Sequence, residues 1–197
     1  METTLISTIY DVEPVMICIT KFSPKKVVLL TEDDGSEVMK ESEETIANAF
    51  GRFIDIKSQK TDSNDIVKIS AAVSEAIEKE KTKGNKIVVN ISGGERPQTF
   101  GTLFGAYSKH QFVDRIVFVD DSTKNAVDLP ILKYRISTTK KEILKCLING
   151  CNSVKKLSEE IKISRGMTYS HIRELRDMGL IDKETLEISM AGRLAIV

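Results

Sequence analysis

Hydrophobic residues along the first two-thirds of the chain follow two alternating patterns. Short runs that are mostly apolar or alternate with polar residues predict strands. They cover residues 3–10, 25–34, 53–59, 86–92 and 115–121. Segments with apolar residues every three or four positions predict helices at 13–20, 36–51, 64–84 and 97–110. This alternation predicts an α/β fold with a Rossmann-like, doubly wound and mainly parallel sheet, covered by helices on both faces.

The pattern changes in the last third of the chain. Residues 125–137 fit a strand and a hinge, and helical patterns then follow at 139–150, 153–161 and 164–179. Ser153 and Ser164 are candidate caps for the last two of these helices. Residues 180–189 fit two short strands around a turn at 183–185, and a short helix closes the chain. Three helices and a hairpin predict a small winged helix-turn-helix domain at 136–197, after a Rossmann-like domain at 1–135.

Charge is distributed unevenly between these two parts. The formal net charge of the whole chain is zero, so no global electrostatic argument favours a nucleic acid partner. Residues 1–138 contain 18 basic and 21 acidic side chains, whereas residues 139–197 contain 11 and 8. The small positive excess in the second part is compatible with DNA binding but does not establish it.

The spacing of the cysteines, the small number of histidines and the lack of long apolar segments argue against several classes of protein. Cys18, Cys146 and Cys151 lack the paired spacing of a disulfide framework, and only two histidines could complete a metal site. We therefore expect no metal, and we interpret the cysteines as packing residues. No apolar run of membrane-spanning length and no leader pattern occur, so we expect a soluble intracellular protein that does not contact a membrane.

The segment VVNISGGERPQTFG, residues 88–101, is the strongest candidate for a ligand site. It places Gly93 and Gly94 after a buried strand, where ligands of doubly wound sheets bind. The glycines allow positive φ and close approach of the backbone, and the following helix start offers N–H groups to an anion. Arg96 can contact a phosphate or stack on a base, while Glu95 repels a phosphate unless it points away or accepts a hydrogen bond from a ribose hydroxyl. We therefore expect a ligand held partly through its sugar and base.

Two motifs give this part of the chain a family resemblance. A strand followed by N-x-[ST]-G-G, a basic residue and a helix, together with Tyr10, Asp11 and Pro14 after the first strand, resembles the CARF domain of CRISPR-associated proteins. With a winged helix at the C-terminus, the chain resembles the Csa-type CRISPR transcription regulators. Family members usually have Thr-Lys after the glycines, where this chain has Glu95-Arg96.

The resemblance implies a cytoplasmic protein of a prokaryote, with an archaeon favoured, and no cofactor. It implies a homodimer whose two CARF domains form one pocket for a cyclic oligoadenylate, most often cyclic tetra-adenylate. Carried onto this sequence, the pocket consists of Tyr10, Asp11, Asn90, Ser92, Gly93, Gly94, Glu95, Arg96 and Gln98.

The predicted third helix of the second domain has the pattern of a recognition helix. Thr168, Ile172 and Leu175 recur at helical spacing and predict its buried stripe. The opposite face carries the candidates for contact with double-stranded DNA, which are Arg165, Tyr169, Ser170 and Arg173. Lys155 and Lys156 on the preceding helix, and Lys183 in the wing, are suited to phosphates.

These features predict a dimeric transcriptional regulator that senses a cyclic oligoadenylate. Three alternatives stay open at this point: a slow, metal-independent ring nuclease, a regulator of another nucleotide or metabolite, and a winged helix that serves protein contacts. The glycine segment has a structural interpretation as well, because any turn between a strand and a helix can use glycine.

Overall fold

The computed structural model describes residues 2–32, 35–82, 84–132 and 136–197. The chain divides into two compact units, Met1–Lys133 and Tyr134–Val197. The predicted domain boundary, between residues 135 and 136, falls at residues 133–135, which lie outside the described part. Two other predicted elements include residues outside the described part: residues 33–34 of the second strand and residue 83 of the third helix.

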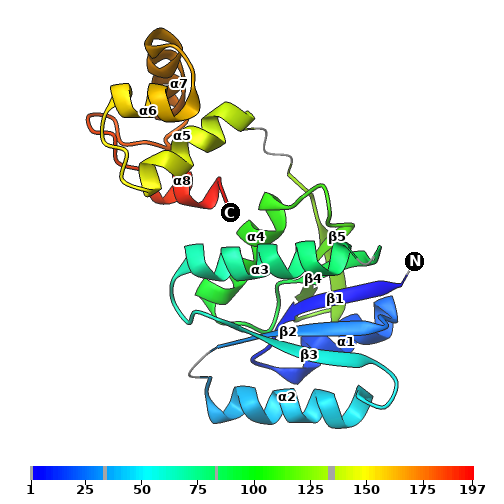
Figure 1. The fold of residues 1–197 in the computed structure, drawn as a ribbon. Helices are drawn as coiled ribbons and strands as arrows, with labels where there is room; N and C mark the ends of the chain where they lie inside the picture. The colour runs from blue at the N-terminus through cyan, green and yellow to red at the C-terminus, as the bar shows by residue number, and fades with distance from the viewer. Residues whose placement is uncertain (1, 33–34, 83, 133–135) are drawn as a thin grey trace. The chain divides into compact units, whose positions relative to one another are not determined.

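The first unit is a sheet flanked by helices (Figure 1). In chain order its elements are β1 (Thr3–Thr8), α1 (Val12–Phe22), β2 (Lys26–Glu32), α2 (Glu37–Phe50), β3 (Asp55–Thr61), α3 (Ile66–Lys81), β4 (Lys86–Asn90), α4 (Arg96–Ser108), β5 (Arg115–Asp120) and β6 (Asn125–Leu129). The strands lie in the order β3-β2-β1-β4-β5-β6, and every neighbouring pair is parallel except β5–β6. The predicted Rossmann-like, mainly parallel sheet is confirmed.

Most elements begin or end within about three residues of their predicted bounds. β3 begins at Asp55, because the N–H groups of Phe53 and Ile54 both donate to the carbonyl of Phe50 in a turn that closes α2. β6 returns antiparallel along β5 after a turn in which the N–H of Lys124 donates to the carbonyl of Asp120.

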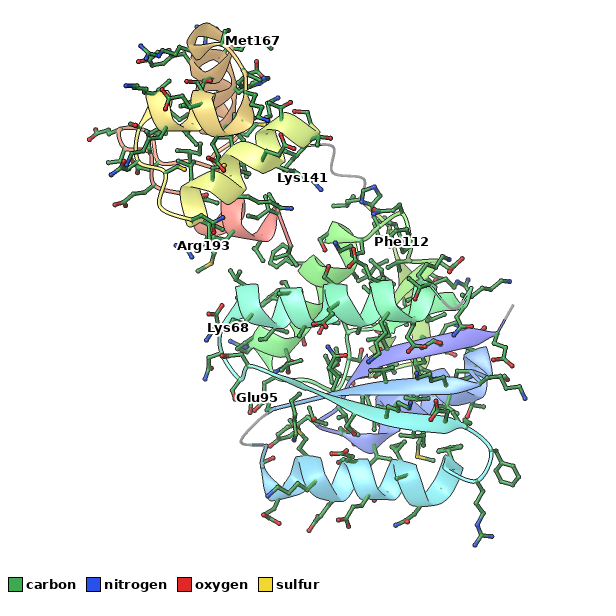
Figure 2. The ribbon with its side chains drawn as sticks, in the orientation of Figure 1. Lys68, Glu95, Phe112, Lys141, Met167 and Arg193 are labelled. Atoms are coloured by element: carbon green, nitrogen blue, oxygen red, sulfur yellow. The ribbon has the colours of Figure 1, made fainter. Side chains whose placement is uncertain are left out.

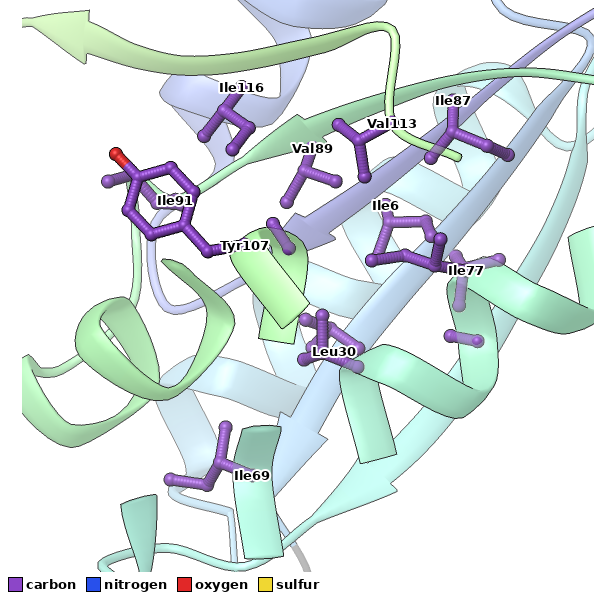
Figure 3. Packing of buried hydrophobic residues seen from close by; sticks show 14 residues of the cluster. Ile6, Leu30, Ile69, Ile77, Ile87, Val89, Ile91, Tyr107, Val113 and Ile116 are labelled. Atoms are coloured by element: carbon purple, nitrogen blue, oxygen red, sulfur yellow. The ribbon is translucent and has the colours of Figure 1, made fainter. Parts of the chain in front are cut away.

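Buried side chains fill both faces of the sheet, as expected for a parallel sheet. Successive residues of β1 point to opposite faces, so Ile6 packs with α3 and α4 while Leu5 packs with α1 and α2. Figure 3 shows the first of these clusters, in which Ile6 of β1 lies beside Ile77 of α3.

Helix α4 approaches α3 closely because it carries glycines at the contact. A Cβ at Gly101 would lie 2.5 Å from Cγ2 of Ile69, and one at Gly105 would lie 2.8 Å from Cβ of Val73. Real side chains do not tolerate such separations, so this contact requires glycine at both positions. The packing fixes α4, and the loop that precedes it, against the sheet.

The second unit contains α5 (Thr138–Ile148), α6 (Val154–Ile161), α7 (Arg165–Asp177) and α8 (Met190–Leu194). Each of these helices follows a serine whose side chain accepts a hydrogen bond from a backbone N–H of the first turn: Ser137, Ser153, Ser164 and Ser189. The caps predicted at Ser153 and Ser164 are thereby confirmed, each worth about 1 kcal/mol.

The core and hairpin of this unit complete a helix-turn-helix fold with a short wing. Its core includes Ile143, Leu144, Leu157, Ile172, Leu175 and Ile181. The two strands predicted within residues 180–189 are reduced to one antiparallel bridge between Ile181 and Ile188. Among all described residues of the chain, no helix is long and apolar enough to cross a membrane.

Candidate functional site

The sheet brings the two predicted ligand segments together. β1 and β4 are parallel neighbours in which Ser7 pairs with Asn90, so their carboxyl ends meet at one edge. After β1 the chain adds β2 and β3 on one side of this pair, and after β4 it adds β5 and β6 on the other side. The pair is therefore the switch point of the sheet, where ligands bind in doubly wound folds. A Cβ at Gly93 would lie 3.3 Å from the carbonyl oxygen of Asp11, so the two loops are in contact.

Hydrogen bonds to both neighbouring strands fix the course of the loop after β4. The hydroxyl of Thr8 donates to the carbonyl of Ser92 at 2.7 Å, and the N–H of Val119 donates to Oγ of Ser92 at 2.6 Å. Asn90 is fully buried; its amide donates to Oγ of Ser7, and its Oδ1 accepts the N–H of Ser92 at 3.1 Å. Asn90 and the Ser92 side chain therefore hold the loop in place.

The two glycines have separate structural reasons. Gly93 has φ +81°, a left-handed conformation in which a side chain is strained. Gly94 lies against β1 and α4, where an added Cβ would be 2.9 Å from Cβ of Thr8 and 3.0 Å from Cβ of Gln98. Local geometry thus requires both glycines, whatever the loop binds.

The start of α4 presents charged side chains to solvent. Glu95 is the N-cap residue but makes no side-chain capping bond in the described structure, and Arg96 begins the helix. Both side chains are exposed, and Figure 2 labels Glu95. Pro97 lies in the first turn, as predicted, where its missing N–H costs no helical hydrogen bond.

Gln98 lies inside the domain rather than at its surface. Its side chain is 2 % exposed, and its Nε2 donates to Oγ1 of Thr61 at 2.9 Å and to the carbonyl of Asp62 at 2.7 Å. It therefore joins α4 to the end of β3. The nine predicted ligand residues divide accordingly into exposed side chains (Tyr10, Asp11, Glu95, Arg96), a half-buried loop (Ser92, Gly93, Gly94) and buried supports (Asn90, Gln98).

The second unit exposes the side chains predicted to contact DNA. Thr168, Ile172 and Leu175 are buried along one face of α7, which confirms the predicted stripe. All seven candidate side chains are exposed: Lys155, Lys156, Arg165, Tyr169, Ser170, Arg173 and Lys183. Met167, at the start of α7, is exposed as well, with 53 % of its surface accessible (Figure 2).

Comparison with protein families identifies both units. Residues 2–120 match the family model described as HFX_2341_N-like, N-terminal, and this match covers more than half of the chain. The chain belongs to the HFX_2341_N-like family. Residues 137–183, from α5 to the wing, match the model for bacterial regulatory proteins of the arsR family. No curated protein matches the sequence.

Solved structures share the fold at low sequence identity. Can2 from Sulfobacillus thermosulfidooxidans in complex with cyclic tetra-adenylate is similar with a TM-score of 0.53 and 16 % identity, over 74 % of this chain and 39 % of that one. Csm6 from Enterococcus italicus, bound to cyclic hexa-2′-fluoro-hexa-dAMP, has a TM-score of 0.55 and 12 % identity, over 92 % and 55 %. Protein VC1899 from Vibrio cholerae has a TM-score of 0.53 and 11 % identity, over 98 % and 64 %.

This chain therefore spans less than two-thirds of the length of each of these structures. The prediction of a Rossmann-like domain followed by a helix-turn-helix domain is confirmed at the level of the fold.

Acidic side chains end two strands, β2 and β5, at the edge of the sheet where the loop of this HFX_2341_N-like domain lies. Glu32 ends β2, and its pKa is raised by burial and by the negative charge of Glu95, against hydrogen bonds from Gln98 and Ser63. Asp120 ends β5, where hydrogen bonds from Ser122 and Thr123 lower its pKa to about 2. Sequence analysis missed Glu32, although its place as the last polar residue of a buried strand put it at the same edge.

Arg176 is a second residue that sequence analysis missed. From the end of α7 it donates to the carbonyls of Asp182, Glu184 and Thr185 at 3.1, 3.3 and 2.8 Å. Oδ1 of Asp182 accepts the N–H groups of Glu184 and Thr185 within the same turn. These bonds, more than strand pairing, hold the turn that exposes Lys183.

Proposed function

We propose that the protein is a dimeric, ligand-responsive DNA-binding regulator whose effector is a cyclic oligoadenylate. The proposal rests on the combination of two domains in one chain. The first is a CARF-like domain with a glycine loop at the switch point of its sheet, and the second is an arsR-type helix-turn-helix. Can2 and Csm6 were solved with cyclic adenylates, and cyclic tetra-adenylate is the first effector to test.

The loop geometry assigns different tasks to the predicted ligand residues. Tyr10, Asp11, Glu95 and Arg96 contact the ring through their side chains, because these are the exposed members of the set. Gly93 and Gly94 allow the course of the loop that its packing against α1, β1 and α4 requires. Asn90 and Gln98 act from behind the loop by holding its shape.

A homodimer follows from the symmetry of the ligand. A twofold dimer presents the same loop twice, and a ring with twofold symmetry can contact both copies equally. Helix α4 offers an apolar surface for such an interface next to the loop, since Phe100, four residues after Arg96, is 49 % exposed.

Calorimetric titration with cyclic tetra-adenylate, cyclic hexa-adenylate and a linear tetra-adenylate tests the ligand, and light scattering tests the dimer. Arg96→Ala removes a charge-assisted hydrogen bond worth about 1.5–3 kcal/mol, so we expect roughly 10- to 150-fold weaker binding. Arg52→Ala, an exposed arginine after α2, is the matched control and should bind like wild type. A strictly monomeric protein without affinity for any adenylate ring would overturn the proposal.

DNA binding rests on the exposed face of α7 and its flanks. After selection of a binding site from a random DNA library, Arg165→Ala combined with Arg173→Ala should abolish the gel shift without changing the oligomeric state. If both arginines contact phosphates, any residual binding should lose about two units from the slope of log K against log salt. The pair Arg52→Ala and Lys57→Ala removes the same charge from exposed positions of the first unit and should leave the shift unchanged.

Regulation requires that the effector distinguish two arrangements of the dimer. The DNA affinity of wild type should therefore change when the effector is added, and Arg96→Ala should not respond at the same effector concentration. Chromatography of the effector after incubation separates a sensor from a ring nuclease. Intact ring supports the regulator, whereas linear product within minutes would indicate an enzyme.

A further inference from the structure

Two cysteines meet at the carboxyl end of α5. The helix ends in a Schellman motif: Gly150 has φ +89°, its N–H donates to the carbonyl of Leu147 at 3.1 Å, and the N–H of Cys151 donates to the carbonyl of Cys146 at 3.0 Å. In this motif the two residues joined by the hydrogen bond that spans five positions along the chain also bring their side chains into contact. In α5 those two residues are Cys146 and Cys151.

Helix α7 has an apolar pair at the two positions that Cys146 and Cys151 occupy in α5. It ends in the same motif, in which Gly179 has φ +71° and the N–H of Leu180 donates to the carbonyl of Leu175 at 2.9 Å. Leu175 and Leu180 are both buried in the core of the unit. An apolar pair satisfies the motif, so packing alone does not require two thiols at the end of α5.

The two thiols are free, close together and partly accessible. Both cysteines are half-buried, pack at the edge of the core and form no disulfide. The 3.0 Å backbone hydrogen bond from Cys151 to Cys146 places the two side chains beside each other at the end of the helix. Cys18, by contrast, is fully buried in the first unit.

We propose that Cys146 and Cys151 form a reversible intramolecular disulfide, which makes the end of α5 a site of oxidative modification by peroxides. The thiolate of one cysteine attacks a peroxide oxygen, the O–O bond breaks, and the sulfur becomes a sulfenic acid as water leaves. The second thiol then attacks that sulfur and releases another water. Two thiols and one hydrogen peroxide thus give one disulfide and two waters, and a dithiol reductant restores the thiols.

The surroundings of Cys146 disfavour its ionisation. Burial is the largest cause that raises its pKa, and the nearby Cys151, Glu160 and Glu142 raise it further. A thiol with a raised pKa is a poorer source of thiolate. Attack on the peroxide by Cys146 is therefore slowed, and a sulfenic acid on either sulfur lies beside the thiol of the other cysteine in the motif.

The proposal can be tested on the full chain without any variant. Trypsin releases both cysteines in one peptide, residues 146–155, and Cys18 in another. After treatment with hydrogen peroxide and alkylation by iodoacetamide, we expect the 146–155 peptide to carry no alkyl groups and to lose about 2 Da. Dithiothreitol before alkylation should restore both adducts, and Cys18 alkylated after denaturation serves as the internal control.

Single variants separate the order of attack from a structural effect. Cys146→Ser should trap a sulfenic acid at Cys151 that dimedone labels, whereas Cys151→Ser should react much more slowly with peroxide. Circular dichroism of both variants checks that the helices are retained. Two alkyl groups on the wild-type peptide after peroxide, oxidation directly to sulfinic acid, or disulfides only between chains would each overturn the proposal.

Discussion

Replacing Gly94 by alanine tests whether packing fixes the second glycine of the loop. The new Cβ would lie 2.9 Å from Cβ of Thr8 and 3.0 Å from Cβ of Gln98, whereas ordinary contacts begin at 3.4 Å. Both neighbouring atoms are bonded directly to the backbone, so rotation of a side chain cannot move them away. β1 or α4 must therefore shift by several tenths of an ångström.

Overpacking of this kind costs about 1–3 kcal/mol. At about 2 cal/mol/K of unfolding entropy per residue, we expect the Tm of the first unit to fall by roughly 4–11 °C. Thermal unfolding followed by circular dichroism measures the change, and hydrogen exchange of peptides covering β1 and α4 assigns it to the first unit.

Gly166→Ala is the matched control for Gly94→Ala. Gly166 lies in α7, and its Cβ would meet only Oγ of Ser164, at 4.0 Å. Alanine there should leave stability unchanged or raise it by up to about 1 kcal/mol, because alanine favours a helix. If Gly94→Ala melted at the wild-type temperature, the loop would have relaxed around the methyl group, and the packing explanation for Gly94 would be refuted.

Two further predictions concern residues that sequence analysis missed. Glu32 has a raised pKa in the folded protein, so its ionisation opposes folding, and stability should rise as the pH falls from neutral through that pKa. Glu32→Gln should be more stable than wild type at pH 7 and lack this pH dependence. Urea unfolding across the acid range measures the free energy of unfolding of both proteins. Equal stability of variant and wild type at every pH would contradict the prediction. Arg176→Gln removes its charged hydrogen bonds to the turn at 182–185, so hydrogen exchange there should accelerate while α7 keeps its helicity. Arg173→Gln is the exposed control, and equal exchange in both variants would exclude a positioning role for Arg176.

The sequence predicted most strands and helices correctly because strands buried on both faces are nearly continuous apolar runs. Val27–Leu30 and Ile87–Val89 are such runs, and both are buried. The antiparallel direction of β6 is not encoded in its own residues. It depends on the tight turn before it, where Asp120 accepts the N–H groups of Ser122 and Thr123 and Lys124 adopts φ +53°.

The meeting of the two loops at one edge of the sheet was predictable, but the roles of the polar residues there were not. A polar residue beside a glycine pair has the same appearance in sequence whether it faces a ligand or supports the loop. Asn90 supports the loop through Ser7, which is 83 residues away, and Gln98 does so through Thr61. Only the folded arrangement of β1, β3 and β4 reveals these partners.

The charges left at the surface of the loop determine which ligand chemistry it can hold. Its exposed charged side chains include Asp11, Glu95 and Arg96, which together carry a formal net charge of −1, and Glu32 lies close to Glu95. Carboxylates only accept hydrogen bonds, so they match ribose hydroxyls and the adenine amino group, which donate. Arg96 and the N–H groups at the start of α4 remain for phosphate, and the ring of Tyr10 can stack on a base. Under the proposed function, recognition therefore depends on the nucleoside parts of the ring, because a ligand made of phosphate alone would meet acceptors where it needs donors.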